Sequence, residues 1–365
     1  MSIHNNTLRL KGLKAIAEAL PDFTYGDYSV SENDAGGETY DIEISTESGG
    51  RLGRFIQDKL DVITADDFGD ATEVPRYFAD NKQSLKRVQL PEGITAIRAS
   101  AFEGCRALEE INLPSSLTTI EPQAFYNNHA IEKLTIPESV SSIGASFGSL
   151  YSLIELNYNA ISVPDFNSNQ RPFTGLGYQS NGTYRKDVKI KIGNKVKRIP
   201  AYTFGKSSSS SNLYVYVTDL IFEDNSVCTT VGNDSFNGCK KLTNIVIPNS
   251  VTNIGAYAFA GCSELTNVSL PMNLTTLGAY AFQSTKLNEI RIPKTITTIN
   301  AGLFNNCKSL AICDFSNHES VPTLSNTNAF TSVPSTCEIR VPAALYDEWV
   351  AATNWSTYAS QIVAV

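Results

Sequence analysis

The chain has 365 residues and a formal net charge of −8, from 29 basic and 37 acidic side chains. Charged residues make up 18% of it, below the roughly 25% usual in soluble domains, whereas 42% are hydrophobic. This composition supplies a core and excludes a disordered acidic chain, and the absence of a dominant basic surface argues against a nucleic-acid-binding protein.

The first 59 residues precede the repeats described below and predict a small N-terminal α/β cap. Residues 1–20 suggest a short amphipathic helix with four apolar residues roughly on one side, Leu8, Leu13, Ile16 and Leu20. Residues 27–44 predict a hairpin that turns at 33–37. The N-terminus shows no export signal, and no stretch approaches the roughly 20 apolar residues of a membrane span.

A 23-residue repeat follows and occupies residues 60–340. The segment that starts at Leu85 aligns with the one that starts at Leu108, 23 residues later. Further close copies start at Ile131, Leu242, Leu265 and Leu287. Their shared frame is L-x-x-I-x-I-P-x-x-V-x-x-I-G-x-x-A-F-x-x-C. The number of copies indicates a repeat architecture rather than several globular domains.

The spacing within one unit predicts its structure. Ile111 and Leu113 alternate with the polar Asn112, which predicts a short strand, and Pro114 ends that strand because it lacks an N–H group. The V-x-x-I step and the A-F pair add further apolar walls. One unit cannot cover its own apolar side, so the units must stack. We therefore predict a repeat solenoid, a right-handed parallel β solenoid with short strands.

Less regular segments extend the array. Leu60, Leu153 and Leu310 each open a further unit, and residues 187–204 and 217–241 are degenerate copies. We expect insertions near 157–186 and 205–216, which either form part of a binding face or loop out without a partner. Residues 341–365 contain both tryptophans, Trp349 and Trp355, and predict a helical C-terminal cap over the last unit.

The unit with I-P, V-x-x-I-G and A-F-x-x-C resembles the BspA-like, or Treponema-type, leucine-rich repeats of many bacterial surface proteins and of some phage and protist proteins. The resemblance covers about residues 60–340, and the tail from Val341 is similar to the segment that often follows such arrays. It implies adhesion to proteins, glycans or host matrix, without shared catalytic residues. It also implies an extracellular or cell-surface location, although the missing export signal keeps a phage virion and the cytoplasm as alternatives.

Few residues suggest chemistry. Residues 144–148 match the G-x-S-x-G motif of hydrolases around Ser146, but they occupy a repeat position without a strand-turn-helix context, and no suitable histidine accompanies them. Four cysteines share one repeat position: Cys105, Cys239, Cys262 and Cys307. The total of seven is odd and no CxxC occurs, so we expect buried free thiols rather than disulfides or a metal site. The acidic cluster from Asp58 to Glu73 does not match a calcium loop, and we interpret it as a solvated face.

Two rows of side chains should run along the exposed strand face. The first alternates in sign over six units: Arg87, Glu110, Lys133, Glu155, Lys189 and Asp219. It continues with Asn244, Asn267 and Glu289. Opposite charges on adjacent strands stabilise each other, so we interpret this row as a self-neutralising ladder. The basic run from Lys186 to Arg198 either meets an acidic polysaccharide or is a half-buried strand with paired lysines, and we favour the second interpretation.

The second row lies two residues further along each strand and is mostly uncharged. It reads Gln89, Asn112, Thr135, Asn157, Lys191, Ile221, Val246, Ser269 and Arg291. Exposed Ile221 and Val246 among amides and hydroxyls are typical of a contact surface. We therefore predict a binding site made of Asn244, Asn267, Ile221, Val246, Ser269, Arg291, Tyr214, Tyr216, Lys189 and Lys191.

These patterns predict a non-enzymatic binding or adhesion protein, active as a monomer, whose partner is a protein or a glycan. We expect no catalytic residue, metal, cofactor, nucleic acid or membrane span. The alternative is a structural element, such as a rigid spacer or a phage tail or virion component.

Overall fold

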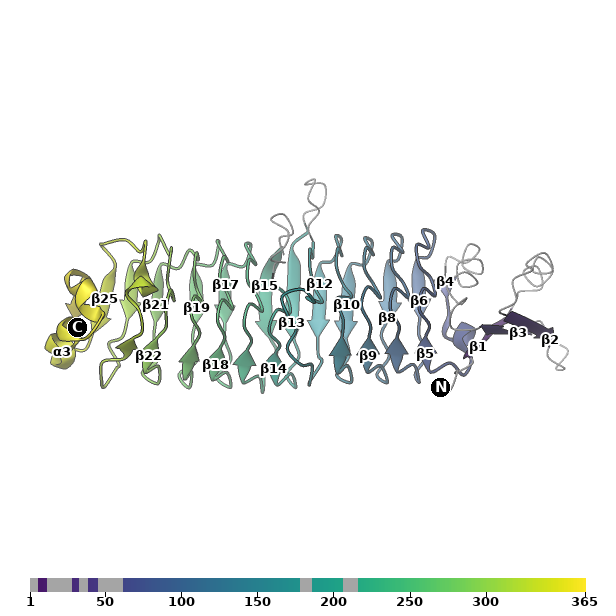
Figure 1. The fold of residues 1–365 in the computed structure, drawn as a ribbon, viewed down its shortest axis with the longest axis horizontal. Helices are drawn as coiled ribbons and strands as arrows, with labels where there is room; N and C mark the ends of the chain where they lie inside the picture. The colour runs from purple at the N-terminus through teal and green to yellow at the C-terminus, as the bar shows by residue number, and fades with distance from the viewer. Residues whose placement is uncertain (1–5, 12–27, 33–38, 45–61, 178–185, 206–215) are drawn as a thin grey trace. The chain divides into compact units, whose positions relative to one another are not determined.

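The computed structural model describes residues 6–11, 28–32, 39–44, 62–177, 186–205 and 216–365. The chain forms two compact units, Met1–Leu153 and Ile154–Val365. Within each unit, short parallel strands stack from one turn of the chain, or coil, to the next and enclose an apolar interior (Figure 1). This arrangement confirms the predicted parallel β solenoid of leucine-rich type.

The N-terminal segment forms a three-stranded antiparallel sheet in the order β1-β3-β2. It consists of β1 (Asn6–Lys11), β2 (Tyr28–Glu32) and β3 (Thr39–Ile44). The antiparallel pairing of the predicted hairpin is confirmed, with Glu32 opposite Tyr40, and its turn at 33–37 lies outside the described residues. The predicted helix is wrong for Asn6–Lys11, because N-T-L-R-L-K alternates polar and apolar residues and favours a strand. The rest of the predicted helix lies outside the described residues.

In the first unit, each coil contributes one strand to each of two rows of parallel strands. One row comprises β4 (Val62–Ile63), β6 (Arg87–Gln89), β8 (Glu110–Asn112) and β10 (Lys133–Ile136), of which β4, β6 and β8 form one sheet. The other comprises β5 (Glu73–Val74), β7 (Ala96–Ile97), β9 (Thr119–Ile120) and β11 (Ser142–Ile143). A 3-10 helix, η2 (Ala65–Phe68), joins β4 to β5. Its Thr64–Asp67 capping box gives one carboxylate of the acidic cluster a structural role.

The second unit continues the same plan. Its strand face comprises β12 (Glu155–Tyr158), β13 (Val188–Ile192), β15 (Val217–Phe222), β17 (Asn244–Val246), β19 (Asn267–Ser269), β21 (Glu289–Arg291), β23 (Ile312–Asp314) and β25 (Glu338–Val341). The short strands of the other ladders are β14 (Arg198–Ile199), β16 (Thr230–Val231), β18 (Asn253–Ile254), β20 (Thr276–Leu277), β22 (Thr298–Ile299) and β24 (Thr323–Leu324). A 3-10 helix, η3 (Thr327–Phe330), follows β24.

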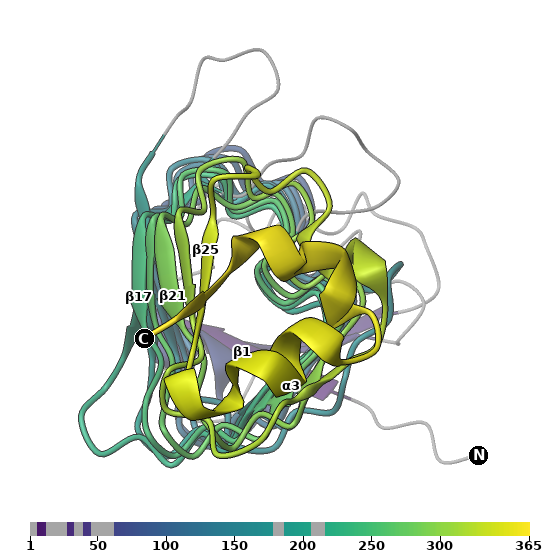
Figure 2. The ribbon, with the colours of Figure 1, turned by 90° about the vertical axis from the view of Figure 1, so that its left-hand side faces the viewer.

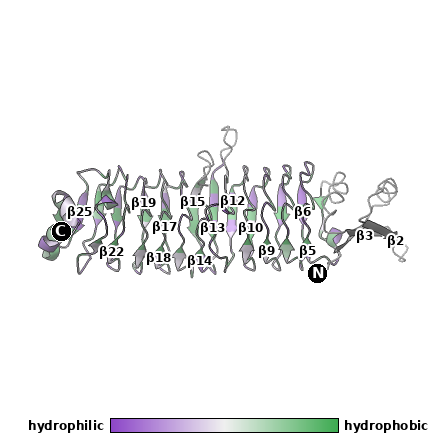
Figure 3. Ribbon diagram, viewed as in Figure 1, coloured by the Kyte–Doolittle hydropathy of each residue, from purple (hydrophilic) through white to green (hydrophobic). Residues whose placement is uncertain are grey.

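The register of the ladders follows the repeat. Arg87 lies opposite Glu110, and Val88 lies opposite Ile111. The middle residue of each three-residue strand points inward, as the exposed-buried-exposed patterns of β6 and β8 show. Within each unit, hydrophobic positions therefore recur from coil to coil (Figure 3). A period of two residues in the strand and of one coil along the stack sorts the side chains into core and surface.

The repeated A-F pair builds a stack of phenylalanine rings through the core. Phe102 and Phe125 stack with centroids 5.5 Å apart, and Phe125 and Phe147 with centroids 5.2 Å apart. In the second unit, Phe236 and Phe259 stack at 5.5 Å with an interplanar angle of 5°. These distances lie within the range of favourable aromatic pairs.

The predicted insertion near 157–186 contributes to this core. Phe173 is fully buried and stacks on Phe204 at 5.2 Å, and Leu176 is also buried. The stretch before residue 178 is therefore the long second half of a coil rather than an excursion. Residues 178–185, and residues 206–215 of the second predicted insertion, lie outside the described part of the chain.

The helical C-terminal cap is confirmed, with one strand that the sequence analysis did not predict. The cap comprises η4 (Ala343–Leu345), α3 (Tyr346–Ala351), η5 (Trp355–Gln361) and β26 (Ile362–Ala364). Trp349 and Trp355 are fully buried with ring centroids 4.6 Å apart, and Nε1 of Trp355 donates to the Pro322 carbonyl at 2.7 Å. In the second unit, α3 lies across the end of the last coils (Figure 2), and β26 pairs in parallel with β25. The cap thus covers the apolar end of the stack.

One core position departs from the repeat and lowers the stability of the core. Asn128 occupies the position of Cys105 one coil later and is fully buried, and neither its Oδ1 nor its Nδ2 has a hydrogen-bond partner. The thiols at this position donate to a carbonyl of the preceding coil, as Cys105 does to Ala79 at 3.0 Å and Cys307 to Phe282 at 3.1 Å. Asn128 is therefore a local weakness of the core.

We predict that Asn128→Cys stabilises the protein. The variant removes two unsatisfied polar atoms, each of which costs about 1–3 kcal/mol, and restores the repeat residue. Chemical denaturation followed by circular dichroism should show a higher midpoint. The reciprocal control, Cys262→Asn, should lower it. A lower midpoint for Asn128→Cys would contradict this account of the core.

Candidate functional site

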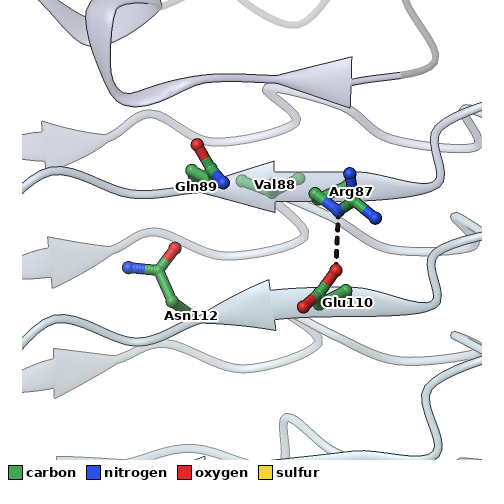
Figure 4. Close-up of a pocket in the computed structure, with 5 residues that line it drawn as sticks. All are labelled: Arg87, Val88, Gln89, Glu110 and Asn112. Atoms are coloured by element: carbon green, nitrogen blue, oxygen red, sulfur yellow. Dashed lines mark hydrogen bonds and ion pairs between the residues drawn. The ribbon is translucent and has the colours of Figure 1, made fainter.

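The first row of the strand face forms the expected charge ladder only in part. In the first unit, Nε of Arg87 donates to Glu110 at 2.6 Å across β6 and β8 (Figure 4). Next to this pair, the side-chain amide of Asn112 makes two hydrogen bonds to the backbone of Leu90, directly after β6. Its Oδ1 accepts from Leu90 N at 2.7 Å, and its Nδ2 donates to Leu90 O at 2.8 Å. Because Arg87 and Glu110 are both more than half exposed, this pair fixes register more than it adds stability.

In the second unit, the ion pairs cross between the two predicted rows. Glu155 lies in register with Lys189, but it forms its ion pair with Lys191, whose Nζ lies 2.8 Å from Oε1 of Glu155. Lys189 is also in register with Asp219. The prediction of lateral neighbours is thus confirmed, but the pairing of Glu155 with Lys189 is wrong because a lysine side chain is long enough to reach a carboxylate diagonally across the strands.

Arg291 of the predicted site and Arg198 of the basic run also have partners. Arg291 lies 3.1 Å from Asp314 on β23, and Arg198 of the basic run pairs with Asp165. Burial opposes the ionisation of Asp314, but hydrogen bonds from Ser316 and the charges of Arg291 and Arg340 hold its pKa below the usual value. The interpretation of the basic run as a half-buried strand with paired lysines is confirmed for β13 and for Lys191.

The aliphatic pair of the second row is exposed as predicted. Val246 on β17 is 72% exposed and Ile221 on β15 is 39% exposed. Both line a shallow depression in the strand face. The depression is lined by Asp219, Leu220, Ile221, Phe222, Glu223, Asp224, Asn225, Ser226, Asn244, Ile245, Val246 and Pro248. It lies where the ladder is interrupted, because β15 and β17 belong to separate sheets.

Polar groups adjoin the aliphatic pair. Nδ2 of Asn267 donates to Oδ1 of Asn244 at 2.8 Å, so these amides form a short ladder from β17 to β19. Ser269 lies in register with Val246. The structure thus brings Ile221, Val246, Asn244, Asn267 and Ser269 together on neighbouring strands. It leaves the paired Lys191 and Arg291 to either side.

Of the two predicted tyrosines, Tyr216 does not line the depression. Tyr216 is half-buried directly before β15, where its carbonyl accepts from Val188 N at 2.9 Å. Tyr214 lies outside the described residues. Glu223 and Asp224 also line the depression, and they were not among the predicted residues. A signal for them existed, because F-E-D-N-S-V, which begins with the last residue of β15, replaces the I-P-N-S-V of the following coil.

Ser146 of the G-x-S-x-G match and the buried His318 both have structural roles. Ser146 is fully buried, and its Oγ donates to the Glu121 carbonyl at 2.6 Å. His318 is buried with Nδ1 and Nε2 at 3.2 and 3.3 Å from the carbonyls of Phe315 and Ile296, and burial lowers its pKa. Within the described residues, no cluster of three or more His, Cys, Asp or Glu side chains could hold a metal ion. In the same residues, no helix combines the length and apolar character needed to cross a membrane.

The cysteines are buried free thiols, as predicted. Burial raises the pKa of Cys105 and Cys262 to about 12, and that of Cys228 and Cys337 to about 11. At neutral pH these side chains therefore remain protonated and act as small apolar residues.

Comparison with known proteins places the repeat in a family. The model of the BspA type leucine-rich repeat region matches residues 72–169 and 229–347, with six copies. A search of curated proteins gave no match. Because the family model matches more than half of the chain, the protein belongs to the BspA-type leucine-rich repeat family.

Several solved structures are similar to this chain. A leucine-rich repeat protein from Bacteroides ovatus is 18% identical with a TM-score of 0.40, over 94% of this chain and 100% of that one. A leucine-rich cell surface protein from Faecalibacterium prausnitzii is 23% identical with a TM-score of 0.38, over 81% of each chain. The pneumococcal vaccine antigen PcpA is 18% identical with a TM-score of 0.39, over 81% of this chain and 85% of that one.

We predict that the native protein does not react with a chromogenic thiol reagent at pH 8, because burial keeps its thiols protonated and inaccessible. After unfolding in guanidinium, all seven cysteines should react. The absorbance gives the number of reactive thiols in the native protein and in the unfolded protein. Rapid reaction of any thiol in the native protein would show that its coil opens or that the thiol is exposed.

Proposed function

We propose that this member of the BspA-type leucine-rich repeat family is a non-enzymatic binding and adhesion protein that contacts a protein or glycan partner through its exposed strand face. The proposal rests on one observation: Ile221 and Val246 are exposed on neighbouring coils, over a depression, in a row that is otherwise polar or paired. Scattered exposed aliphatic residues need no explanation, but an adjacent pair in a depression is typical of a contact surface.

The arrangement around the pair suits recognition. Rigid parallel coils hold Val246, Asn244 and Ser269 in fixed positions, so a partner that fits them loses little entropy in the protein on binding. The Asn244–Asn267 amides and the Ser269 hydroxyl supply hydrogen bonds at the rim. We place this role in a monomer at the cell surface or outside the cell, in keeping with the surface proteins that the repeat resembles.

A structural role is the second candidate. In the first unit, the strand face pairs its own charges, as Arg87 and Glu110 do, and Asn112 binds the backbone of the neighbouring coil with its whole amide. A face that satisfies its polar groups internally suits a spacer or a virion component, in which the ends of the array contact other molecules.

We predict that the double variant Ile221→Ser, Val246→Ser weakens partner binding by about tenfold or more, because central apolar residues dominate contact energies. Both side chains are exposed, so folding should be unaffected. The full chain would be tested on arrays of extracellular-matrix proteins and of glycans.

The matched control is Met272→Ser, which removes an apolar side chain that is 56% exposed outside the depression. The control should bind like the wild type. If the double variant keeps every signal of the wild type, the strand face is not the contact surface and the spacer role is favoured.

A further inference from the structure

The depression over β15 and β17 is acidic as well as apolar. Among the described residues, its lining includes the carboxylates of Asp219, Glu223 and Asp224 and no basic side chain. All three residues are exposed. Oε2 of Glu223 accepts from the backbone N of Asn194 at 3.1 Å, and Oδ2 of Asp219 accepts from Thr218. Neutral donors such as these leave the negative charges uncompensated.

Of the strand-face cations Lys189, Lys191 and Arg291, two are engaged elsewhere, so Lys189 is the one set against the three carboxylates of the depression. On one side, Lys191 forms its ion pair with Glu155, and on the other, Arg291 forms its pair with Asp314. Lys189 lies in register with Asp219 but forms no ion pair with it in the described part of the chain. In those same residues, Glu223 and Asp224 also have no ion-pair partner. The depression therefore carries an excess of negative charge next to exposed aliphatic side chains.

This combination selects one class of partner. An aliphatic side chain would remove Val246 and Ile221 from water, and an ammonium or guanidinium group one or two residues away would meet Glu223 and Asp224. An acidic polysaccharide would be repelled by the three carboxylates. Among the described residues of the lining, Phe222 is the one aromatic residue, and because it is half-buried it offers a neutral sugar little ring surface to stack on.

We propose that the depression binds a cationic segment of a partner protein in which an aliphatic side chain lies next to lysine or arginine. This inference rests on the proposed function and specifies the chemistry of the partner at the same surface. The aliphatic contact anchors the segment, and the carboxylates supply charge recognition. Binding at an exposed acidic site of this kind weakens as salt rises, because ions screen exposed charges.

The test uses the full chain and two synthetic peptides of equal length. Both carry valine at the same positions, with lysine between the valines in one and glutamate in the other. Fluorescence anisotropy should show that the lysine peptide binds and the glutamate peptide does not. The isosteric double variant Glu223→Gln, Asp224→Asn should bind the lysine peptide about tenfold more weakly and lose most of the salt dependence.

Glu289→Gln is the matched control, since Glu289 is an exposed carboxylate on the strand face outside the depression. It should leave the affinity of the lysine peptide unchanged. The proposal is overturned if Glu223→Gln, Asp224→Asn binds the lysine peptide as the wild type does, or if the glutamate peptide or a heparin oligosaccharide binds as tightly.

These outcomes also separate this inference from the proposed function. Suppose that Ile221→Ser, Val246→Ser abolishes binding on the protein or glycan arrays, while Glu223→Gln, Asp224→Asn leaves that binding intact. The strand face would then be the contact surface, and only the cationic class of partner would be wrong. If both variants keep the array binding of the wild type, the proposed function and the cationic class of partner are both overturned.

Discussion

The hydrogen-bonded register between successive coils is the constraint on which the rest of the structure depends. It places each residue beside its own counterpart in the next coil, so that Val88 lies opposite Ile111 and Phe102 stacks on Phe125. A side chain that packs well against a copy of itself is therefore favoured at every core position. Phenylalanine and cysteine meet this requirement, because flat rings stack and a thiol reaches the carbonyl of the coil before it. A buried amide such as Asn128 does not meet it, because neither neighbouring coil offers that amide a partner.

On the surface, the same register disfavours identical charged side chains in successive coils. Identical charges would repel along the stack, and an alternating row such as Arg87 and Glu110 avoids this repulsion. On a regular strand face, the charged and polar side chains consequently pair with one another and leave few groups for a partner. Recognition requires a place where the counterparts differ. The coils of β15 and β17 are such a place, since the ladder is interrupted there and the turn after β15 carries Glu223 and Asp224 where the following coil carries a proline turn.

Because the repeat determines the register, the sequence was enough to predict the coils and the residues that point inward or outward. It also predicted the exposure of Ile221 and Val246 and the burial of the thiols. The sequence was not enough to predict which of two nearby side chains forms an ion pair, because that choice depends on the tertiary geometry. Lys189 and Lys191 are both within reach of Glu155, and only the course of the side chains selects Lys191. The strand Asn6–Lys11 was missed because a few leucines spaced along a longer segment also fit a helix, although the local alternation favours a strand. Glu223 and Asp224 were missed because they lie beyond the strand, in a turn that the row-by-row comparison did not include.

Departures from the repeat have different consequences inside and outside the solenoid. Asn128 lies in the core, where two polar atoms without partners reduce the stability of the coil that carries them. Glu223 and Asp224 also break the pattern, but their carboxylates remain in water, so the fold loses little by carrying them. A solenoid can therefore change its surface turns freely while its core stays close to the repeat. Specificity in such a chain should lie in the turns and strand ends that leave the consensus, and the depression at β15 and β17 combines such a turn with the exposed Val246.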